Sequence, residues 1–185
     1  MGPAAVAGYL WGALGYALPA AALALGAAWL LGARPGGGRA ALALSTAFVV
    51  ALALTPLPDP GALDCAGGGT AIRLQLFGFL EAPRRLWEAG APPAAWLTDL
   101  TITSTIMNVV FFALVGAALA TQTRHRAPVL LFACALTAFI ETAQLTGLFG
   151  LYPCRYRSFD VDDLLLNVVG VLLGAALMRW ARHRS

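Results

Sequence analysis

The chain carries little charge and no lysine. Only 11% of its 185 residues are charged, and all twelve basic residues are arginines. Soluble domains carry about 25% charged residues, whereas this chain is 59% hydrophobic, with a mean hydropathy of +0.76. The composition therefore indicates an integral membrane protein. A nucleic-acid partner is not expected, because the arginines lie scattered between hydrophobic segments and form no basic patch.

Histidine and cysteine are also scarce, with two and three residues. His125 and His183 both lie in arginine-rich segments that are predicted to be cytoplasmic, so neither can serve a site on the outer side, and a Ser/His/Asp arrangement is not expected there. No cofactor is predicted. The acids Glu141, Asp160, Asp162 and Asp163 leave a divalent-cation site as an alternative, since hard cations bind oxygen ligands, but we predict no metal.

Five hydrophobic segments have the length of about 20 residues that spans a bilayer core. We therefore expect an all-α polytopic helical membrane bundle that forms one membrane domain over residues 1–185. The predicted spans are residues 9–31, 40–57, 102–120, 127–148 and 163–180, and a long loop covers residues 58–101.

Arginine marks the ends of three of these spans. GARPGGGR follows the first span, TQTRHRA follows the third, and RWARHRS ends the chain; none of the three contains an acid. Short cytoplasmic loops carry an excess of Arg and Lys. With five spans, all three segments fall on one side, so we predict a multi-pass protein of the cell membrane whose C-terminus is cytoplasmic. The N-terminus and the loop 58–101 then face outward.

The outward loop contains an amphipathic pattern between Ile72 and Trp87, interrupted by Pro83. A helix lying on the outer membrane surface fits this pattern, and a lid that packs on the outer helix ends fits it equally. Cys65 and Cys154 both fall in predicted outward loops, where an oxidising compartment permits a disulfide between them. Cys134, in the middle of the fourth span, is expected to be a buried thiol.

Polar side chains occupy similar depths in three of the predicted spans. They are Asn108 in the third span, Glu141 and Gln144 in the fourth, and Asp163 and Asn167 in the fifth, with Arg155 and Arg157 in the loop above them. Ionisable groups in a span usually face a cavity or a partner. One interpretation is a buried hydrogen-bond network in which Arg157 pairs with an acid. The other is an outward-facing pocket for a ligand, and the two can coexist.

Two residue types near this cluster have structural interpretations. Asp160 precedes the fifth span and is expected to cap its first turn, where an acid also suits the helix dipole. Gly170 and Gly174 continue the stripe of Asp163 and Asn167 along the helix, and we expect them to let another helix approach closely.

Two motifs built from these residues resemble those of VanZ-like membrane proteins. The first is Glu141-x-x-Gln144 followed by Arg157-x-x-Asp160-x-x-Asp163-x-x-x-Asn167-x-x-Gly170-x-x-x-Gly174. The second is Asn108-x-x-x-Phe112-x-x-x-Gly116, where Leu114 stands at a position at which the family often has proline. The resemblance covers about residues 101–178. It implies an accessory membrane protein of the cell envelope, in a family named for tolerance of teicoplanin-type glycopeptides.

The expected function is binding at the outward polar site. An arginine grips phosphate or carboxylate oxygens through paired hydrogen bonds, so an anionic lipid head group or a lipid-linked cell-wall precursor is the predicted ligand. Asn108, Glu141, Gln144, Arg155, Arg157, Asp160, Asp163 and Asn167 are the predicted ligand-binding residues. Two alternatives remain open: an enzyme acting on a lipid-linked substrate, with Glu141 or Asp163 as general base, and a scaffold that docks another envelope protein.

Overall fold

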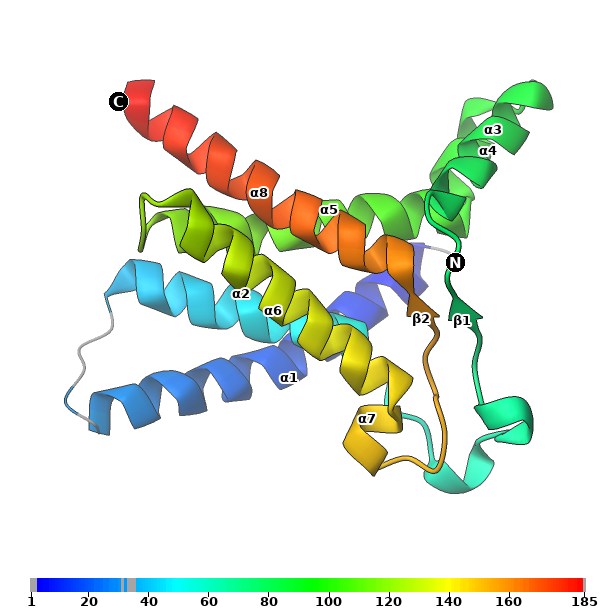
Figure 1. The fold of residues 1–185 in the computed structure, drawn as a ribbon, viewed down its shortest axis with the longest axis horizontal. Coiled ribbons are helices and arrows are strands. Elements are labelled where there is room, and N and C mark those ends of the chain that lie inside the picture. Colours follow the sequence, from blue (N-terminus) through cyan, green and yellow to red (C-terminus); the bar gives the residue numbers. More distant parts are fainter. Residues whose placement is uncertain (1–2, 31, 33–35, 185) are drawn as a thin grey trace.

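A computed structural model of the chain describes residues 3–30, 32 and 36–184, and within them five helices are long and apolar enough to cross a membrane (Figure 1). These are α1 (Pro3–Leu30), α2 (Gly37–Leu54), α5 (Leu100–Ala120), α6 (Arg126–Leu145) and α8 (Val161–Arg184). The predicted all-α bundle with five spans is thereby confirmed.

Two of the long helices end earlier than predicted, for local reasons. α2 ends at Leu54 because the residue before a proline, here Thr55 before Pro56, disfavours helical backbone. α6 ends at Leu145 because Gly147 has φ +59° and the two residues after it also have positive φ. Glu141 therefore lies about 6 Å from the helix end, since four residues rise about 1.5 Å each, and not the 10 Å implied by a helix reaching residue 148.

α5 and α8 lie side by side along much of their length, in direct backbone contact (Figure 1). Gly116 of α5 faces the backbone of Val171, while Gly174 of α8 faces the backbone of Ala113. A methyl group at either glycine would overlap a carbonyl group of the facing helix. The small residues thus let the two backbones touch, as in close helix pairs of membrane proteins.

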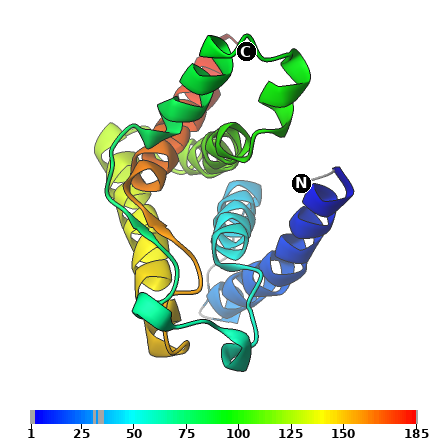
Figure 2. The ribbon, with the colours of Figure 1, turned by 90° about the vertical axis from the view of Figure 1, so that its right-hand side faces the viewer.

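The apolar core lies where α6 and α2 cover this pair. Its buried side chains are Val49, Phe112, Val115, Leu119, Ala120, Val129, Ala133, Leu136, Ile140, Val171 and Ala175. α1 packs chiefly on α2, through a second cluster around Ala13, Ala17, Ala51 and Leu52. α2 therefore lies between α1 and the group of α5, α6 and α8 (Figure 2).

Six of the described arginines lie at one end of the bundle, which we call the arginine end (left in Figure 1): Arg39, Arg124, Arg126, Arg179, Arg182 and Arg184. There Arg179 donates to the carbonyl of His125 at 3.2 Å, and Arg182 donates to the carbonyl of Ala120 at 3.3 Å. Arg34, part of the predicted basic loop, lies outside the described residues. The opposite end carries the bond between Cys65 and Cys154 and is called the disulfide end.

The loop at the disulfide end contains short elements. They are the 3₁₀ turns η1 (Pro60–Ala62), η2 (Ala66–Gly68) and η3 (Gly78–Leu80), the helices α3 (Glu81–Glu88), α4 (Pro93–Thr98) and α7 (Gly147–Gly150), and the strands β1 (Ile72–Arg73) and β2 (Phe159–Asp160).

The expected amphipathic helix between Ile72 and Trp87 is present only from α3 onward. Ile72 and Arg73 instead form β1, which pairs in parallel with β2, placing Ile72 opposite Phe159. Backbone pairing across the loop therefore overrides the helical pattern of the first residues. Pro83 lies in the first turn of α3, where proline is tolerated.

Candidate functional site

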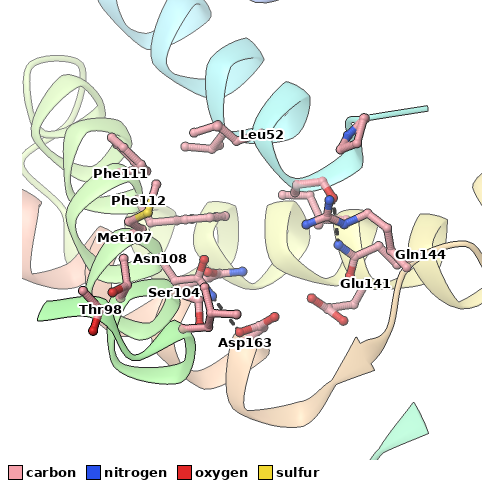
Figure 3. A pocket seen from close by; sticks show the side chains of 18 of the residues that line it. Leu52, Thr98, Ser104, Met107, Asn108, Phe111, Phe112, Glu141, Gln144 and Asp163 are labelled. Carbon is pink, nitrogen blue, oxygen red and sulfur yellow. Dashed lines mark hydrogen bonds between the residues drawn. The ribbon is translucent and has the colours of Figure 1, made fainter. Parts of the chain in front are cut away.

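A cavity of about 500 Å³ lies at the disulfide end, between α2, α5, α6 and α8 (Figure 3). Its walls are mostly apolar and include Leu52, Phe111, Phe112 and Ile140. Six predicted ligand-binding residues line it together: Asn108, Glu141, Gln144, Arg157, Asp163 and Asn167. The structure thus brings the polar groups of three helices into one space.

The two carboxyl groups in the cavity are each held by one hydrogen bond. Asn108 on α5 donates its Nδ2 to Asp163 Oδ1 on α8 at 2.6 Å. Glu141, whose residue is only 2% exposed, accepts the backbone N–H of Asp160 at Oε2 over 3.2 Å. The ion pairs found among the described residues, Arg73–Asp160, Arg84–Glu88 and Arg85–Asp99, include neither of them.

Two buried amides each leave one oxygen without a partner. Gln144 (5% exposed) donates Nε2 to the carbonyl of Ala53 at 3.0 Å, and Asn167 (3% exposed) donates Nδ2 to Thr137 Oγ1 at 3.2 Å. Gln144 Oε1 and Asn167 Oδ1 have no hydrogen-bond partner among the described residues. A buried acceptor left unpaired costs about 1–3 kcal/mol, so these two oxygens are suited to a donor supplied from the cavity.

Arg157 lines the cavity and also holds the end of α2. Its Nη1 donates to the carbonyl of Thr55 at 2.6 Å. Gln144 donates to Ala53 in the same way, and the hydroxyl of Tyr156 donates to Leu54 at 2.9 Å. The last carbonyls of a helix have no partner within the helix, so these three side chains satisfy the end of α2. Burial raises the pKa of Tyr156 above its usual range, which keeps that hydroxyl a donor.

A known protein family matches most of the chain. The sequence profile described as VanZ/LLP1 matches residues 42–182. The chain belongs to the VanZ/LLP1 family. No curated protein and no solved structure matches it. The match starts within α2 and ends within α8, so it contains every residue that lines the cavity of this VanZ-like membrane protein.

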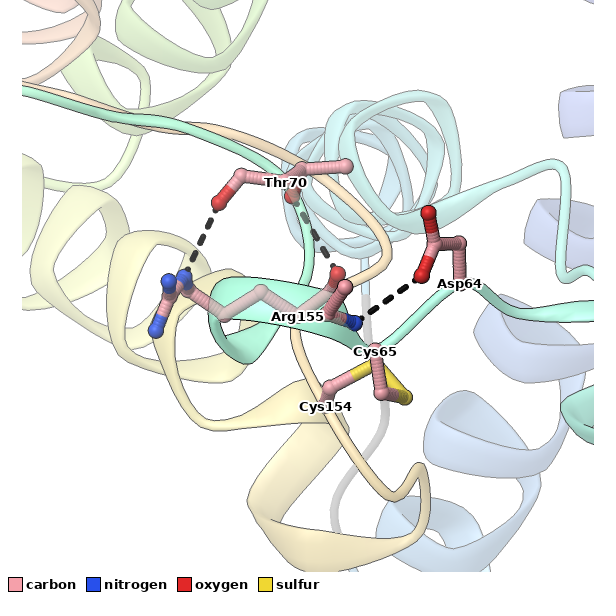
Figure 4. Close-up of a disulfide and its surroundings, with 6 residues drawn as sticks. Asp64, Cys65, Thr70, Cys154 and Arg155 are labelled. Atoms are coloured by element: carbon pink, nitrogen blue, oxygen red, sulfur yellow. Dashed lines mark hydrogen bonds between the residues drawn. A yellow bond between two sulfur atoms is a disulfide. The ribbon is translucent and has the colours of Figure 1, made fainter.

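Two of the predicted ligand-binding residues of the VanZ-like chain do not line the cavity. Arg155 donates Nε to the carbonyl of Thr70 at 3.1 Å and lies over Gly68, in the loop (Figure 4). Asp160 caps α8, because its Oδ1 accepts the N–H of Asp162 at 2.9 Å, and its other oxygen lies 3.8 Å from Arg73. Both side chains organise the disulfide end and stay outside the cavity.

The disulfide joins the two loops of that end. Cys65 and Cys154 form a bond with an S–S distance of 2.08 Å and a sequence separation of 89 residues (Figure 4). Next to it, Gly69 pairs with Arg155 in an isolated bridge, and Gly69 has φ +90°, which suits glycine. Within the described residues, no group of three His, Cys, Asp or Glu side chains is placed to hold a metal ion.

Sequence reasoning missed the residues that α2 and the start of α5 bring to the cavity. Thr103, Ser104 and Met107 line it from α5, beside Asn108. Ser104 precedes Asn108 by four residues and shares its helix face, which is a signal that was present in the sequence. α2 contributes apolar side chains and backbone carbonyls, which carry no such signal.

Asp162 is a buried anchor for the loop. This residue is 5% exposed, and its carboxylate accepts the N–H of Phe77 at 2.7 Å and of Phe79 at 3.0 Å. We expect Asp162→Ala to release this part of the loop, because hydrogen bonds to a charged group contribute about 1.5–3 kcal/mol each. Trypsin should then cleave after Arg73 or Arg84 faster than in the wild type.

Asp64→Ala is the matched control for this prediction. Asp64 Oδ1 accepts only a local bond from the N–H of Ala66 at 2.9 Å, on the exposed surface of the same loop. Its loss should leave cleavage after Arg73 and Arg84 unchanged. Equal cleavage rates for Asp162→Ala and the wild type would show that the loop does not depend on Asp162.

Proposed function

We propose that this VanZ-like membrane protein binds the phosphate-bearing head group of a membrane lipid or of a lipid-linked cell-wall precursor in its cavity. The observation that carries the proposal is the guanidinium of Arg157 in the lining of a partly apolar cavity. The unpartnered oxygens of Gln144 and Asn167 in the same cavity are acceptors, and they suit hydrogen-bond donors elsewhere on the head group. Ligand sites are typically apolar cavities of about 300–1,000 Å³ with a few convergent polar groups.

Arg157 is the group that recognises the phosphate. A guanidinium has five N–H donors in a fork that matches phosphate oxygens. Among the described residues, this side chain donates one hydrogen bond, to the carbonyl of Thr55 just after α2, so other N–H groups remain for a phosphate. Asn108 and Asp163 hold each other and fix the opposite wall.

The cavity has an apolar, partly exposed rim, which suits a ligand that stays in the bilayer. Its lining includes Leu97 and Leu100, which are 81% and 61% exposed, and Pro56 at the end of α2. Hydrocarbon chains leave the cavity between α2 and α5, past these apolar side chains, while the head group stays between the polar ones.

Two features support an outward orientation of the disulfide end. Disulfides persist in oxidising compartments, and Cys65 and Cys154 are bonded there. The arginine end, with Arg39, Arg124 and Arg179, suits the cytoplasmic side by the distribution of positive charge. The cavity then faces the outer leaflet, where lipid-linked wall precursors are used, and such a ligand would connect the protein to glycopeptide tolerance.

Native mass spectrometry of the full chain in mild detergent tests the proposal. The wild type should retain a lipid, and Arg157→Gln should lower the retained fraction at least about tenfold, the effect of 1.4 kcal/mol. Arg155→Gln removes a guanidinium two residues away that lies outside the cavity, and it should retain the lipid. Thermal unfolding of each variant checks that it is folded.

Three other results would each support a different conclusion. Equal losses in Arg155→Gln and Arg157→Gln would contradict a site in this cavity. A folded wild type that retains no lipid would favour the scaffold that docks an envelope protein. Chemical conversion of an added lipid-linked substrate, abolished by Glu141→Gln, would favour an enzyme with Glu141 as base.

A further inference from the structure

The cavity offers more acceptors than donors. Its acceptors are the carboxyl groups of Glu141 and Asp163 and the unpartnered oxygens of Gln144 and Asn167. The charged donor facing these four groups is Arg157, while the amides of Asn108, Gln144 and Asn167 each already give one N–H to the protein. A head group that carries only phosphate oxygens would pair with Arg157 and add no donor for the amide oxygens of Gln144 and Asn167, so a ligand with donors of its own fits the cavity better.

The charges of the cavity point in the same direction. Inside the cavity, Arg157 lies within electrostatic range of both Glu141 and Asp163, and the two carboxyl groups lie within range of each other. Outside it, Asp160 lies within range of both acids and Arg73 within range of Asp163. No ion pair among the described residues includes either acid. Burying an ionised carboxylate is costly unless an opposite charge accompanies it, and one arginine faces two acids. A phosphate bound at Arg157 leaves both acids without a positive partner, so a positive charge on the same head group offsets part of their charge.

We propose that the head group carries a primary ammonium next to its phosphate, with the phosphate at Arg157 and the ammonium between Glu141 and Asp163. This inference rests on the proposed function and names the ligand chemistry of the same cavity. An ammonium has three N–H donors, enough to reach both carboxylates and one of the amide oxygens. A trimethylated amine brings the charge without the donors, and a sugar brings hydroxyl donors without the charge.

Two sources supply this chemistry. One is a glycerophospholipid with an ethanolamine head group. The other is a lipid-linked wall precursor that carries a free amine on its sugar or peptide. Both present a phosphate and a primary amine at the polar end of a hydrocarbon chain, and the experiment separates them.

The first arm measures selectivity with defined lipids. The purified full chain is incubated with equal amounts of dioleoyl phosphatidylethanolamine, phosphatidylcholine and phosphatidylglycerol, and retained lipid is counted by native mass spectrometry. A glycerophospholipid source predicts that phosphatidylethanolamine exceeds each of the others at least about tenfold, as expected for one additional ion pair. The second arm treats the lipid that co-purifies from native membranes with an amine-reactive reagent. A labelled lipid of another mass identifies the precursor source.

Two isosteric variants test the placement of the ammonium. Glu141→Gln keeps an oxygen for the N–H of Asp160, and Asp163→Asn keeps an oxygen for Asn108, so both preserve the observed hydrogen bonds. Each should reduce the retained amine-bearing lipid about tenfold with little change in unfolding temperature. Glu88→Gln, an exposed acid paired with Arg84, should change nothing.

Different results would contradict the ammonium site and the phosphate site on which it rests. A co-purified lipid without an amine, or a preference for phosphatidylglycerol that Arg157→Gln abolishes, overturns the ammonium and leaves the phosphate site standing. Unchanged retention in both Glu141→Gln and Asp163→Asn also overturns the ammonium. Absence of any retained lipid overturns both.

Discussion

The double substitution Gly116→Ala with Gly174→Ala is expected to disrupt the packing of α5 against α8. A Cβ at Gly116 would overlap the carbonyl of Val171, and one at Gly174 would overlap the carbonyl of Ala113. These are backbone atoms of packed helices, so neither can move aside alone. Overpacking costs about 1–3 kcal/mol per site, and the two sites lie on the same helix pair. The unfolding temperature in detergent should fall by many degrees.

Glycines of α1 provide the control for this experiment. Nothing lies within 4 Å of a Cβ built at Gly12 or Gly26. Gly12→Ala and Gly26→Ala should leave stability unchanged or raise it, because alanine favours a helix over glycine by about 1 kcal/mol. An equal loss of stability in both pairs would show that the α5–α8 contact is not the reason.

Removal of the disulfide is expected to cause the second large loss of stability. Cys65 and Cys154 are 89 residues apart, and a crosslink of that span contributes about 4–5 kcal/mol on the chain-entropy model. The helices α5 and α6 lie within this span, so an unfolded state that keeps them helical reduces the gain. Cys65→Ser with Cys154→Ser should lower the unfolding temperature, and dithiothreitol should lower that of the wild type equally.

Cys134→Ser is the control for the disulfide. Cys134 is exposed on α6, contrary to the buried position expected from its place in the middle of a span. A serine there should behave like the wild type with and without dithiothreitol. An unchanged unfolding temperature in the double variant Cys65→Ser with Cys154→Ser would contradict a stabilising role of the bond.

The fold was predictable because the length of each hydrophobic segment determines whether it can span a membrane. Each of the five spans was placed from apolar length alone, and the differences are confined to ends such as Leu54 and Leu145. Cys134 shows the limit of the same signal, since in a membrane bundle both the inward and the outward face of a helix are apolar. Which face is buried was visible only where polar or glycine residues marked it, as at Asn167 and Gly174.

The cavity was predictable on the three helices that carry polar side chains. Asn108, Glu141 and Asp163 stand at matching depths, and depth can be counted along a helix. The fourth wall was not predictable, because α2 presents Leu52, Ala53 and backbone carbonyls. The position of the Arg155 side chain outside the cavity was also not predictable from the sequence. Its direction depends on the pairing of the 69–73 backbone with residues 155–160, and the sequence around Ile72 favours a helix instead.

The side chains that face the ligand also hold the end of α2. Gln144 and Arg157 donate to the carbonyls of Ala53 and Thr55. Occupancy of the cavity and the position of α2 are then thermodynamically coupled, and such coupling is reciprocal. If the cavity binds the proposed ligand, a ligand that draws Arg157 toward itself would loosen the end of α2, and a shift of α2 would alter affinity. α1 packs on α2 and lies entirely outside the matched residues 42–182. Under the proposed function, substitutions in α1 would change affinity without altering a cavity residue.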